Sequence, residues 1–398
     1  MTTLNDTPSS NRIHIGLYGK RNSGKSSLLN ALAGQDISIV SDTAGTTTDP
    51  VNKPMEIHGL GACVLIDTAG FDDTGALGES RTLKTKASAE KTDIAILLFS
   101  DSDISLEKEW LKLFNDRHTP VIAVISKSDL RDDVDSLRKI ITNELNITPI
   151  IVSSATKEGM ESLMEALLRA LPEDFEPVSI LGNLVNSKDC VMLVMPQDIQ
   201  APKGRLILPQ VQTIRELLDN KCTVVCCTTD TISDTLDTLK RPPKLIVTDS
   251  QAFKTVYDSK PAESMLTSFS VLFASYKGDI RYYIESSCYI DKLTEHSKVL
   301  IAECCTHAPL AEDIGRVKLP NLLRKRVDAR LSIDIISGTD FPEDLTGYDL
   351  IIQCGACMFN RKYVLSRINR AKEQSVPMTN YGIAIAKLTN ILDKIVYP

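Results

Sequence analysis

Short apolar runs alternate with amphipathic stretches along most of the chain. Residues 94–99 and 121–126 are apolar runs of strand length, whereas residues 159–171 carry apolar side chains at the spacing of a helix. Strands that alternate with helices favour right-handed crossover connections and a mostly parallel sheet. The pattern therefore predicts an α/β fold.

The strands and helices predicted in the first 172 residues are enough to form one α/β unit. A polar lead at 1–10 comes before them, and an acidic segment with two prolines at 172–177 indicates a linker after them. The predicted strands cover residues 12–17, 63–66, 94–99, 121–126 and 150–152, and the predicted helices cover residues 24–32 and 159–171. This part is expected to fold as one unit, over residues 10–174.

Two smaller α/β units are expected to follow, at 178–261 and 262–398, and we find no sequence repeat of fixed period. The first of them has predicted strands at 190–195, 223–228 and 244–248 and helices at 211–218 and 231–239. The second has predicted strands at 298–303, 332–337 and 349–353 and helices at 280–293, 319–326, 361–374 and 381–396.

Composition narrows the class of protein. The chain has 398 residues, of which 42% are hydrophobic and 24% charged, as in ordinary globular proteins. A net charge of -7 argues against a chain-wide affinity for nucleic acid or for an anionic membrane. The longest apolar runs fall short of the ~18 residues that a membrane span needs, and the N-terminus does not resemble a secretory signal. We expect a cytoplasmic protein.

A phosphate-binding motif lies between the first predicted strand and the first predicted helix. Residues 19–26 read G-K-R-N-S-G-K-S, which fits G-x-x-x-x-G-K-S in the required context; a chance glycine-rich loop is the alternative. Backbone N–H groups of such a loop surround a phosphate, Lys25 reaches the β and γ phosphates, and the Ser26 hydroxyl binds Mg²⁺. The candidate nucleotide-binding residues here are Gly19, Asn22, Ser23, Gly24, Lys25, Ser26 and Ser27.

Three further motifs follow in the order that a GTPase needs. The D-T-A-G motif at 67–70 follows a strand, so that Asp67 can hold Mg²⁺ through water and the Gly70 N–H can meet the γ phosphate. The S-K-S-D motif at 126–129 ends another strand, where the Asp129 carboxylate can accept two N–H groups of guanine that adenine lacks. The S-S-A-T motif at 153–156 ends a fifth strand and can close over the base, so the remaining candidates for contact with the base are Lys127, Ser154 and Ala155. The series indicates a P-loop domain that binds GTP or GDP.

Residues 12–172 resemble the translation-factor-like small GTPases, in particular the branch with the tRNA-modification GTPase and Era-like proteins. The segment D-T-A-G-T-T-T-D at 42–49 is similar to the switch segment of that branch. The resemblance implies that Thr47 senses the γ phosphate and Mg²⁺, and Thr48 stands where arginine is usual. By this resemblance the catalytic residues are Lys25, Thr47, Asp67 and Gly70.

Three positions refine what the resemblance implies. Phe71 stands where Ras-like enzymes carry the glutamine that orients water, so intrinsic hydrolysis should be slow. Asn22 occupies the position that helps bind a monovalent cation in potassium-activated relatives, which predicts stimulation by K⁺. Ser126 replaces the usual asparagine, which removes an amide that contacts guanine and braces the phosphate loop. We therefore expect a modest affinity for nucleotide.

Ten cysteines in a reducing compartment are unlikely to form five disulfides. Two cysteine clusters directly follow predicted strands: C-G-A-C at 354–357 and E-C-C-T-H at 303–307. Because the carboxyl ends of parallel strands share one edge of a sheet, both clusters should converge. Cys305, Cys354 and Cys357 then suit an iron–sulfur cluster, structural zinc, or no metal. The other cysteines are expected to be packing residues: Cys63, Cys190, Cys222, Cys226, Cys227, Cys288 and Cys304.

Together with the GTPase motifs, C-T-H at 305–307 and Q-C-G-A-C at 353–357 resemble the C-x-H and H-C-x-x-C signature of the HydF family, the maturation GTPases of (FeFe)-hydrogenases. Segments 201–215 and 379–386 also resemble that family. The resemblance implies a GTPase domain (10–174), a dimerisation domain (178–261) and an iron–sulfur domain (262–398). It further implies a 4Fe-4S cluster on the three cysteines and scaffold or carrier work on the diiron precursor. The implied partners are apo-(FeFe)-hydrogenase, the radical maturases HydE and HydG, and a second copy of the chain.

Gln353 departs from this pattern, because the family has a histidine there. The candidates for the fourth iron position are therefore water, the precursor itself, Glu303 and His307. Basic residues near the cysteines form either a rim for anionic cargo or a solvated helix face; they are Arg324, Lys325, Arg326, Arg330, Arg361, Lys362, Arg367, Arg370 and Lys372. Two other functions stay open: an RNA-associated GTPase and a zinc-stabilised GTPase without a redox cofactor.

Overall fold

The protein is seen in a computed structural model that describes residues 9–34, 50–57, 60–72, 76–171, 178–196, 206–304 and 314–398. The chain divides into two compact units, Met1–Glu176 and Pro177–Pro398, which we describe one at a time. None of the described helices is long and apolar enough to cross a membrane.

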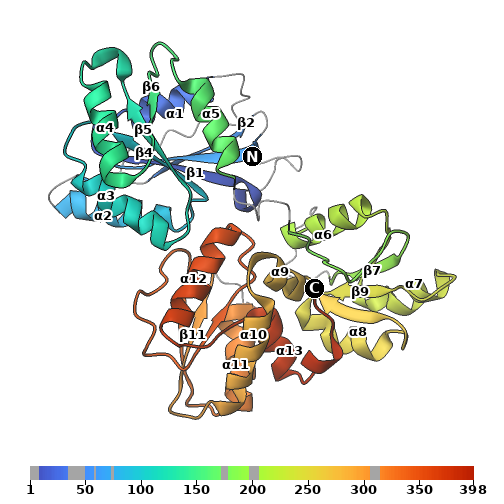
Figure 1. Ribbon diagram of the computed structural model, residues 1–398. Helices are drawn as coiled ribbons and strands as arrows, with labels where there is room; N and C mark the ends of the chain where they lie inside the picture. Colours follow the sequence, from blue (N-terminus) through green and yellow to red (C-terminus); the bar gives the residue numbers. More distant parts are fainter. Residues whose placement is uncertain are drawn as a thin grey trace. The chain divides into compact units, whose positions relative to one another are not determined.

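The first unit is built around a six-stranded sheet with the order β2-β3-β1-β4-β5-β6 (Figure 1). Every neighbouring pair is parallel except β2 and β3. The strands are β1 (Ile13–Gly19), β2 (Val51–Ile57), β3 (Gly61–Asp67), β4 (Ile94–Phe99), β5 (Val121–Ser126) and β6 (Ile150–Val152). All residues of β1 and β4 are buried, which is why these central strands read as continuous apolar runs.

Helices cover both faces of this sheet, as the α/β prediction requires. They are α1 (Lys25–Ala33), α2 (Ala76–Ala89), α3 (Ser105–Asp116), α4 (Val134–Leu145) and α5 (Met160–Arg169), with short 3-10 turns η1 (Ser9–Asn11) and η2 (Ser128–Leu130). Leucines of α1 and α5 pack on one face, and Trp110 and Phe114 of α3 pack with Leu137 of α4 on the other. Strand β2 was not predicted, because Pro54 interrupts it; proline is tolerated there since β2 lies at the edge of the sheet.

The second unit contains two four-stranded sheets, ordered β10-β9-β7-β8 and β12-β11-β13-β14, and every pairing in both is parallel. The first sheet consists of β7 (Cys190–Val194), β8 (Thr223–Cys227), β9 (Leu245–Thr248) and β10 (Met265–Ser268). The second consists of β11 (Lys298–Ala302), β12 (Ser332–Ile336), β13 (Leu350–Gln353) and β14 (Met378–Asn380). The short strands β10 and β14 were not predicted. The prediction of α/β units with mostly parallel sheets is confirmed.

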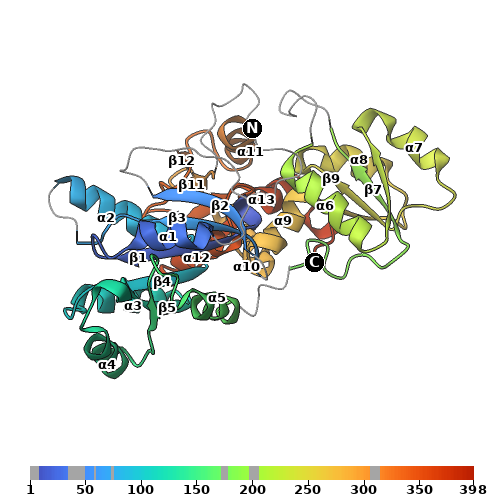
Figure 2. The same cartoon turned by 90° about the horizontal axis from the view of Figure 1, so that it is seen from above.

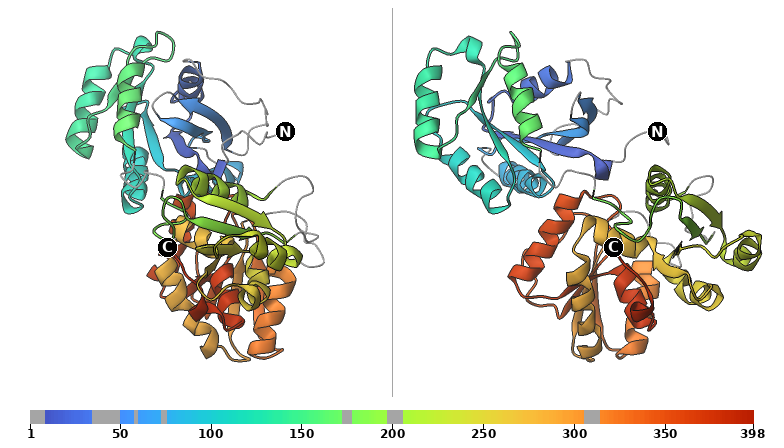
Figure 3. Two further views of the ribbon diagram at one scale, coloured as in Figure 1. Left: turned by 90° about the vertical axis from the view of Figure 1, so that its right-hand side faces the viewer. Right: turned by 45° about the vertical axis from the view of Figure 1, so that its right-hand side comes forward.

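The helices that connect the strands of the first sheet are labelled in Figure 2, and those of the second sheet are orange to red in Figure 3. They are α6 (Leu208–Asp219), α7 (Ile232–Thr238), α8 (Phe253–Ser259), α9 (Phe269–Lys277), α10 (Ile280–Ser287), α11 (Leu319–Arg326), α12 (Arg361–Glu373) and α13 (Tyr381–Leu388). Shorter turns are η4 (Thr229–Thr231), η5 (Ser250–Ala252), η6 (Cys288–Lys292), η8 (Leu392–Lys394) and the π-helical turn η7 (Ile314–Lys318).

The two sheets repeat one topology in the same register. In each, the first strand pairs with the second on one side and the third on the other, and Val191 and Val299 occupy the same place opposite Leu245 and Leu350. Each sheet also ends in a helix capped by a polar side chain, Ser268 before α9 or Asn380 before α13. The sequence shows no repeat because the shared pattern lies in pairing and capping, not in residue identity.

A single hydrophobic core joins these two sheets, with members from β7, β9, β11 and β13 and from helices α9 and α10. Strand β10 of the first sheet lies beyond residue 261, where the boundary between the second and third domains was expected; the three domain ranges stay a prediction. In both sheets the second strand lies on one side of the first strand and the third lies on the other, so the order of the strands changes direction at the first strand. The carboxyl ends of β7 and β9, and of β11 and β13, therefore flank topological switch points, where ligands of such sheets bind.

Candidate functional site

The phosphate-binding loop connects β1 to α1 and wraps around the side chain of Lys25. The buried Lys25 ammonium donates to the carbonyl oxygens of Gly19 at 2.9 Å and Lys20 at 2.7 Å. Gly24 has a φ of 91° and Asn22 a φ of 55°, so the loop uses the left-handed region twice. A bound phosphate would compete with these two carbonyls for the ammonium group.

Ser26 and Asp67, the predicted Mg²⁺ residues, lie side by side. The Ser26 hydroxyl donates to Asp67 Oδ2 at 2.7 Å, and the buried Oδ1 of Asp67 has no hydrogen-bond partner among the described residues. An orphaned carboxylate oxygen next to a hydroxyl suits a hard divalent cation with oxygen ligands. Thr47, the predicted sensor of the γ phosphate, lies outside the described residues.

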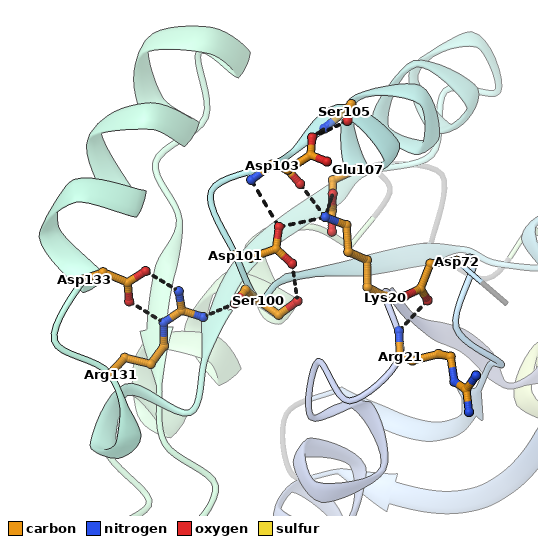
Figure 4. Close-up of polar contacts among 10 residues, drawn as sticks. All are labelled: Lys20, Arg21, Asp72, Ser100, Asp101, Asp103, Ser105, Glu107, Arg131 and Asp133. Carbon is orange, nitrogen blue, oxygen red and sulfur yellow. Dashed lines mark hydrogen bonds and ion pairs between the residues drawn. The ribbon is translucent and has the colours of Figure 1, made fainter.

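Gly70 sits where the D-T-A-G motif passes the phosphate loop. The backbone N–H of Arg21 donates to Asp72 Oδ1 at 2.6 Å (Figure 4), and a Cβ on Gly70 would lie 2.7 Å from the same nitrogen. Glycine is therefore required for this close approach. Phe71 is buried and stacks on Trp110 with centroids 5.4 Å apart, and its apolar side chain cannot orient a water. The contact of Asp72 was not predicted from the sequence.

The predicted base-binding residues are linked to the phosphate loop. The Lys127 ammonium donates to the carbonyl oxygen of Asn22 at 2.6 Å, and the Ser126 hydroxyl donates to that of Ser23. The expectation that Ser126 leaves the loop unbraced is therefore wrong, because the shorter side chain still reaches it. Asp129 Oδ1 accepts a hydrogen bond from the Ser153 hydroxyl at 2.6 Å, which orients the carboxylate.

The other candidates of this site differ in exposure. Ser153 belongs to the S-S-A-T motif that was predicted to close over the base, but its contact with Asp129 was not predicted. Its hydroxyl also accepts from the Thr156 N–H at 3.1 Å, so it shapes the turn. Ser23 is fully buried and its hydroxyl has no partner among the described residues, whereas Ser27 is exposed on α1.

A charged cluster ties the phosphate loop to the segment after β4 (Figure 4). The Lys20 ammonium donates to Asp101 Oδ1 at 2.8 Å and to the carbonyl oxygen of Asp103, and lies 3.8 Å from Glu107 Oε2. Glu107 is 1% exposed, and this burial raises its pKa from 4.5 to about 7, against the smaller opposing effect of Lys20. The sequence carried no signal for this cluster, because Lys20 stands at a variable position of the motif.

The second candidate site lies at the carboxyl ends of β11 and β13, the switch point of the last sheet. Cys354 Sγ accepts hydrogen bonds from the N–H groups of Cys304 at 3.2 Å and Ala356 at 3.4 Å. A further hydrogen bond from the Cys304 thiol is the main reason that the pKa of Cys354 is lowered, and burial opposes it. This environment favours a thiolate, the form of cysteine that binds metals.

The structure brings Cys354, Cys357 and Glu303 to this edge, as predicted, whereas Cys305 and His307 lie outside the described residues. Within the described ranges, no group of three or more His, Cys, Asp or Glu side chains is placed to hold a metal ion. Glu303 pairs with Arg316, whose Nε donates to Glu303 Oε2 at 3.0 Å, and it also accepts from Ser337 at 3.4 Å.

Gln353 is fully buried at the end of β13, and neither atom of its amide has a hydrogen-bond partner among the described residues. Buried polar groups are nearly always paired, so an orphaned amide next to Cys354 indicates a polar group missing from this site. A cluster bound by cysteine sulfurs fits this donor set.

Two buried cations lie beside the cysteines. Lys277 of α9 is 2% exposed, and burial lowers its pKa to about 8. Arg367 of α12 is 1% exposed; its Nη2 donates to the Gly338 carbonyl at 2.6 Å and its Nη1 to Cys304 Sγ at 3.8 Å. The guanidinium also lies 4.7 Å from the ring of Phe341 and 4.8 Å from that of Tyr363.

These contacts correct two expectations. The prediction that Arg367 lies on a solvated helix face is wrong, because this residue shares the buried side of α12 with Val364, Ile368 and Ala371. The prediction that the other cysteines are packing residues is wrong for Cys226 and Cys288, which are exposed. It is confirmed for Cys63, Cys222 and Cys304, which are buried. Every described cysteine is a free thiol.

Comparison with known families covers most of both units. Residues 180–278 match the hydrogen maturase F dimerization domain, and residues 281–398 match the hydrogen maturase F tetramerization domain. The chain belongs to the hydrogen maturase F (HydF) family. Residues 14–127 match the 50S ribosome-binding GTPase family, so this HydF-family chain carries an N-terminal GTPase domain, the class of domain that hydrolyses GTP. The two C-terminal matches are to domains that form oligomers.

Curated relatives that are GTPases match part of the chain. The tRNA modification GTPase MnmE of Ehrlichia ruminantium (strain Gardel) is 31% identical over 228 residues, which is 52% of this chain and 50% of that protein. The protein of the same name from Treponema denticola is 36% identical over 170 residues, 40% of this chain and 35% of that protein. The chain thus spans about half or less of their length. Among solved structures, Era in complex with MgGDPNP and ribosomal RNA has a TM-score of 0.35 at 19% identity, covering 54% of this chain and 92% of that one.

Proposed function

We propose that this HydF-family chain binds and hydrolyses GTP and acts as an iron–sulfur scaffold or carrier that delivers a diiron precursor to apo-(FeFe)-hydrogenase. The observation that carries the proposal is the cysteine edge at the switch point of the last sheet. There, Cys354 Sγ accepts two backbone N–H groups beside the orphaned amide of Gln353, in a chain whose two C-terminal segments match the HydF family.

For the nucleotide, each role follows from contacts within the first unit. Lys25 exchanges its two loop carbonyls for phosphate oxygens, and Ser26 with Asp67 holds Mg²⁺. The N–H of Gly70 and the side chain of Thr47 meet the γ phosphate. The Asp129 carboxylate, oriented by Ser153, selects guanine. Because Phe71 is packed against Trp110, hydrolysis is slow without help, and Asn22 provides a place for K⁺.

For the cluster, Cys305, Cys354 and Cys357 are the proposed iron ligands. When bound, a 4Fe-4S cluster supplies an iron whose fourth position is exchangeable. Glu303 is already engaged by Arg316, so it would have to release this ion pair to take that position. His307, water or the precursor are the other candidates. Delivery then depends on partners: HydE and HydG load the precursor, and the apo-hydrogenase receives it.

Nucleotide binding acts on partner association in this proposal. The contacts of the phosphate loop with Asp72 and with Asp101 and Glu107 link it to segments that follow β3 and β4. GTP and Mg²⁺ would rearrange such contacts, as in other switch GTPases. The iron chemistry itself stays in the second unit.

The proposal is tested by anaerobic reconstitution with iron and sulfide. Wild type should bind about four irons and four sulfides per chain if the cluster is 4Fe-4S, and Cys305→Ser, Cys354→Ser and Cys357→Ser should each lose most of this content. Cys288→Ser, which changes an exposed cysteine, is the matched control and should keep it. A colourless, zinc-loaded wild type would end the cluster hypothesis.

The nucleotide part is tested separately with Lys25→Ala, which should abolish GTP hydrolysis and leave cluster content unchanged. If Lys25→Ala supported hydrogenase maturation at the wild-type rate, the nucleotide site would not be required for delivery.

A further inference from the structure

The ammonium group of Lys277 is held by the loop that carries Cys354 and Cys357. Lys277 is the last residue of α9, and its Nζ donates to the carbonyl oxygens of Ala356 at 3.1 Å, Cys357 at 3.2 Å and Phe359 at 2.8 Å. Ala356 has a φ of 48°, in the left-handed region that side chains rarely adopt. The three hydrogen bonds hold the loop in this unfavourable conformation.

A second cation connects the same two segments, but this one lies after the cysteine loop and contacts the end of α9. Arg361, the first residue of α12 just after the cysteine loop, donates through Nη1 to the carbonyl oxygen of Tyr276 at 2.8 Å, and more weakly to those of Ser275 and Gly278. These carbonyls end α9, where the helix dipole is negative and attracts a cation. The end of α9 and the cysteine loop therefore hold each other through two cations.

Among the described residues, no carboxylate pairs with Lys277 or with Arg367, although both side chains are almost fully buried. Burying a cation without a counter-charge is costly. An anionic group at the cysteine edge would offset this cost, and a cluster bound by three thiolates is anionic.

The repeated topology offers an internal comparison. Counted from the capping residues Ser268 and Asn380, the position that matches Lys277 is Thr389, the residue directly after α13. The Thr389 hydroxyl donates within its own helix, to Ile385 at 2.7 Å. The loop after β9, which matches the cysteine loop, carries Asp249 and Ser250 in place of the cysteine and glycine. Among the described residues, the lysine contact thus has no counterpart at the loop that lacks the C-x-x-C motif.

We propose that Lys277 is a positioning residue of the cysteine site, which fixes the C-x-x-C loop and supplies positive charge to the cluster from the neighbouring dimerisation domain. Lys277 lies within residues 180–278, the match to that domain, and the loop lies within 281–398. The charge part of this inference rests on the proposed cluster; the positioning part concerns the metal-free protein as well.

The test compares Lys277→Met and Lys277→Arg with wild type in the full chain. Lys387→Met is the matched control, because Lys387 lies in the last turn of the matching helix α13 and pairs with Asp291 instead. In metal-free protein, amide hydrogen exchange of residues 354–359 should be about 10-fold faster in Lys277→Met, since three hydrogen bonds to the loop are lost, and unchanged in the control. After reconstitution, iron affinity should fall about 10-fold, the lower end of the effect of removing an outer-shell partner.

The reduction potential separates charge from packing. Because a buried cation stabilises the reduced, more negative cluster, Lys277→Met should shift the potential to more negative values, while Lys277→Arg should keep it near wild type. Unchanged exchange and unchanged potential in Lys277→Met would overturn the inference. If wild type itself takes up no cluster, the proposed function fails, and the exchange measurement on metal-free protein still decides the positioning role.

Discussion

Ionisation of the buried Glu107 should make the stability of the first unit depend on pH. Burial raises the pKa of this carboxyl group from 4.5 to about 7, so the folded state retains a proton that the unfolded chain releases. The contribution of Glu107 to stability is therefore greatest below pH 4.5, falls as the pH rises from there to about 7, and then levels off. Since one pH unit is worth about 1.4 kcal/mol, the folded state loses about 3 kcal/mol over this range.

The substitution Glu107→Gln removes this dependence while keeping the shape of the side chain. The variant should match wild type near pH 4.5 and be more stable at pH 8, by up to about 3 kcal/mol. Urea unfolding followed by tryptophan fluorescence measures the difference, because Trp110 is the one tryptophan of the chain and packs in the same core, on the same helix. Glu109→Gln changes an exposed glutamate of that helix and serves as the control.

Two results would refute this reasoning. If wild type and Glu107→Gln lost stability in parallel between pH 5 and pH 8, the carboxyl group would not be the titrating group. If Glu107→Gln were less stable than wild type at pH 8, the ion pair with Lys20 would outweigh the cost of burying the charge.

Two further predictions concern hydrolysis and backbone strain. GTP hydrolysis should be severalfold faster in K⁺ than in Na⁺ buffer, because Asn22 lies in the phosphate loop and Phe71 cannot orient water; equal rates would contradict this. Gly159→Ala should cost about 2 kcal/mol, because a Cβ there would lie 1.9 Å from the Ile151 carbonyl oxygen. Gly61→Ala, at an equally left-handed but open position, should cost about 1 kcal/mol by the same urea assay, and equal losses in both would exclude the clash.

Much of the architecture was predictable because hydrophobic spacing and motif position are local properties. The alternation of buried strands with helices indicated α/β units, and the phosphate motif was recognised by the strand and helix on either side. The convergence of the two cysteine clusters followed from topology alone, since neighbouring parallel strands end at one edge of a sheet. Strands β2, β10 and β14 were missed because they are short or contain proline.

By itself, the sequence determined which chemical groups the chain carries and at which strand ends they stand. The tertiary structure decided which charges are buried and what they contact. Arg367 and Lys277 look like surface cations in the sequence, because a charged residue among helical spacings usually faces water; packing of α9 and α12 against the last sheet places both beside the cysteines. Packing likewise brings Lys20 close to Glu107, although the two residues are far apart in the sequence. Burial depends on how distant elements pack, and it converts ordinary charges into groups that require partners.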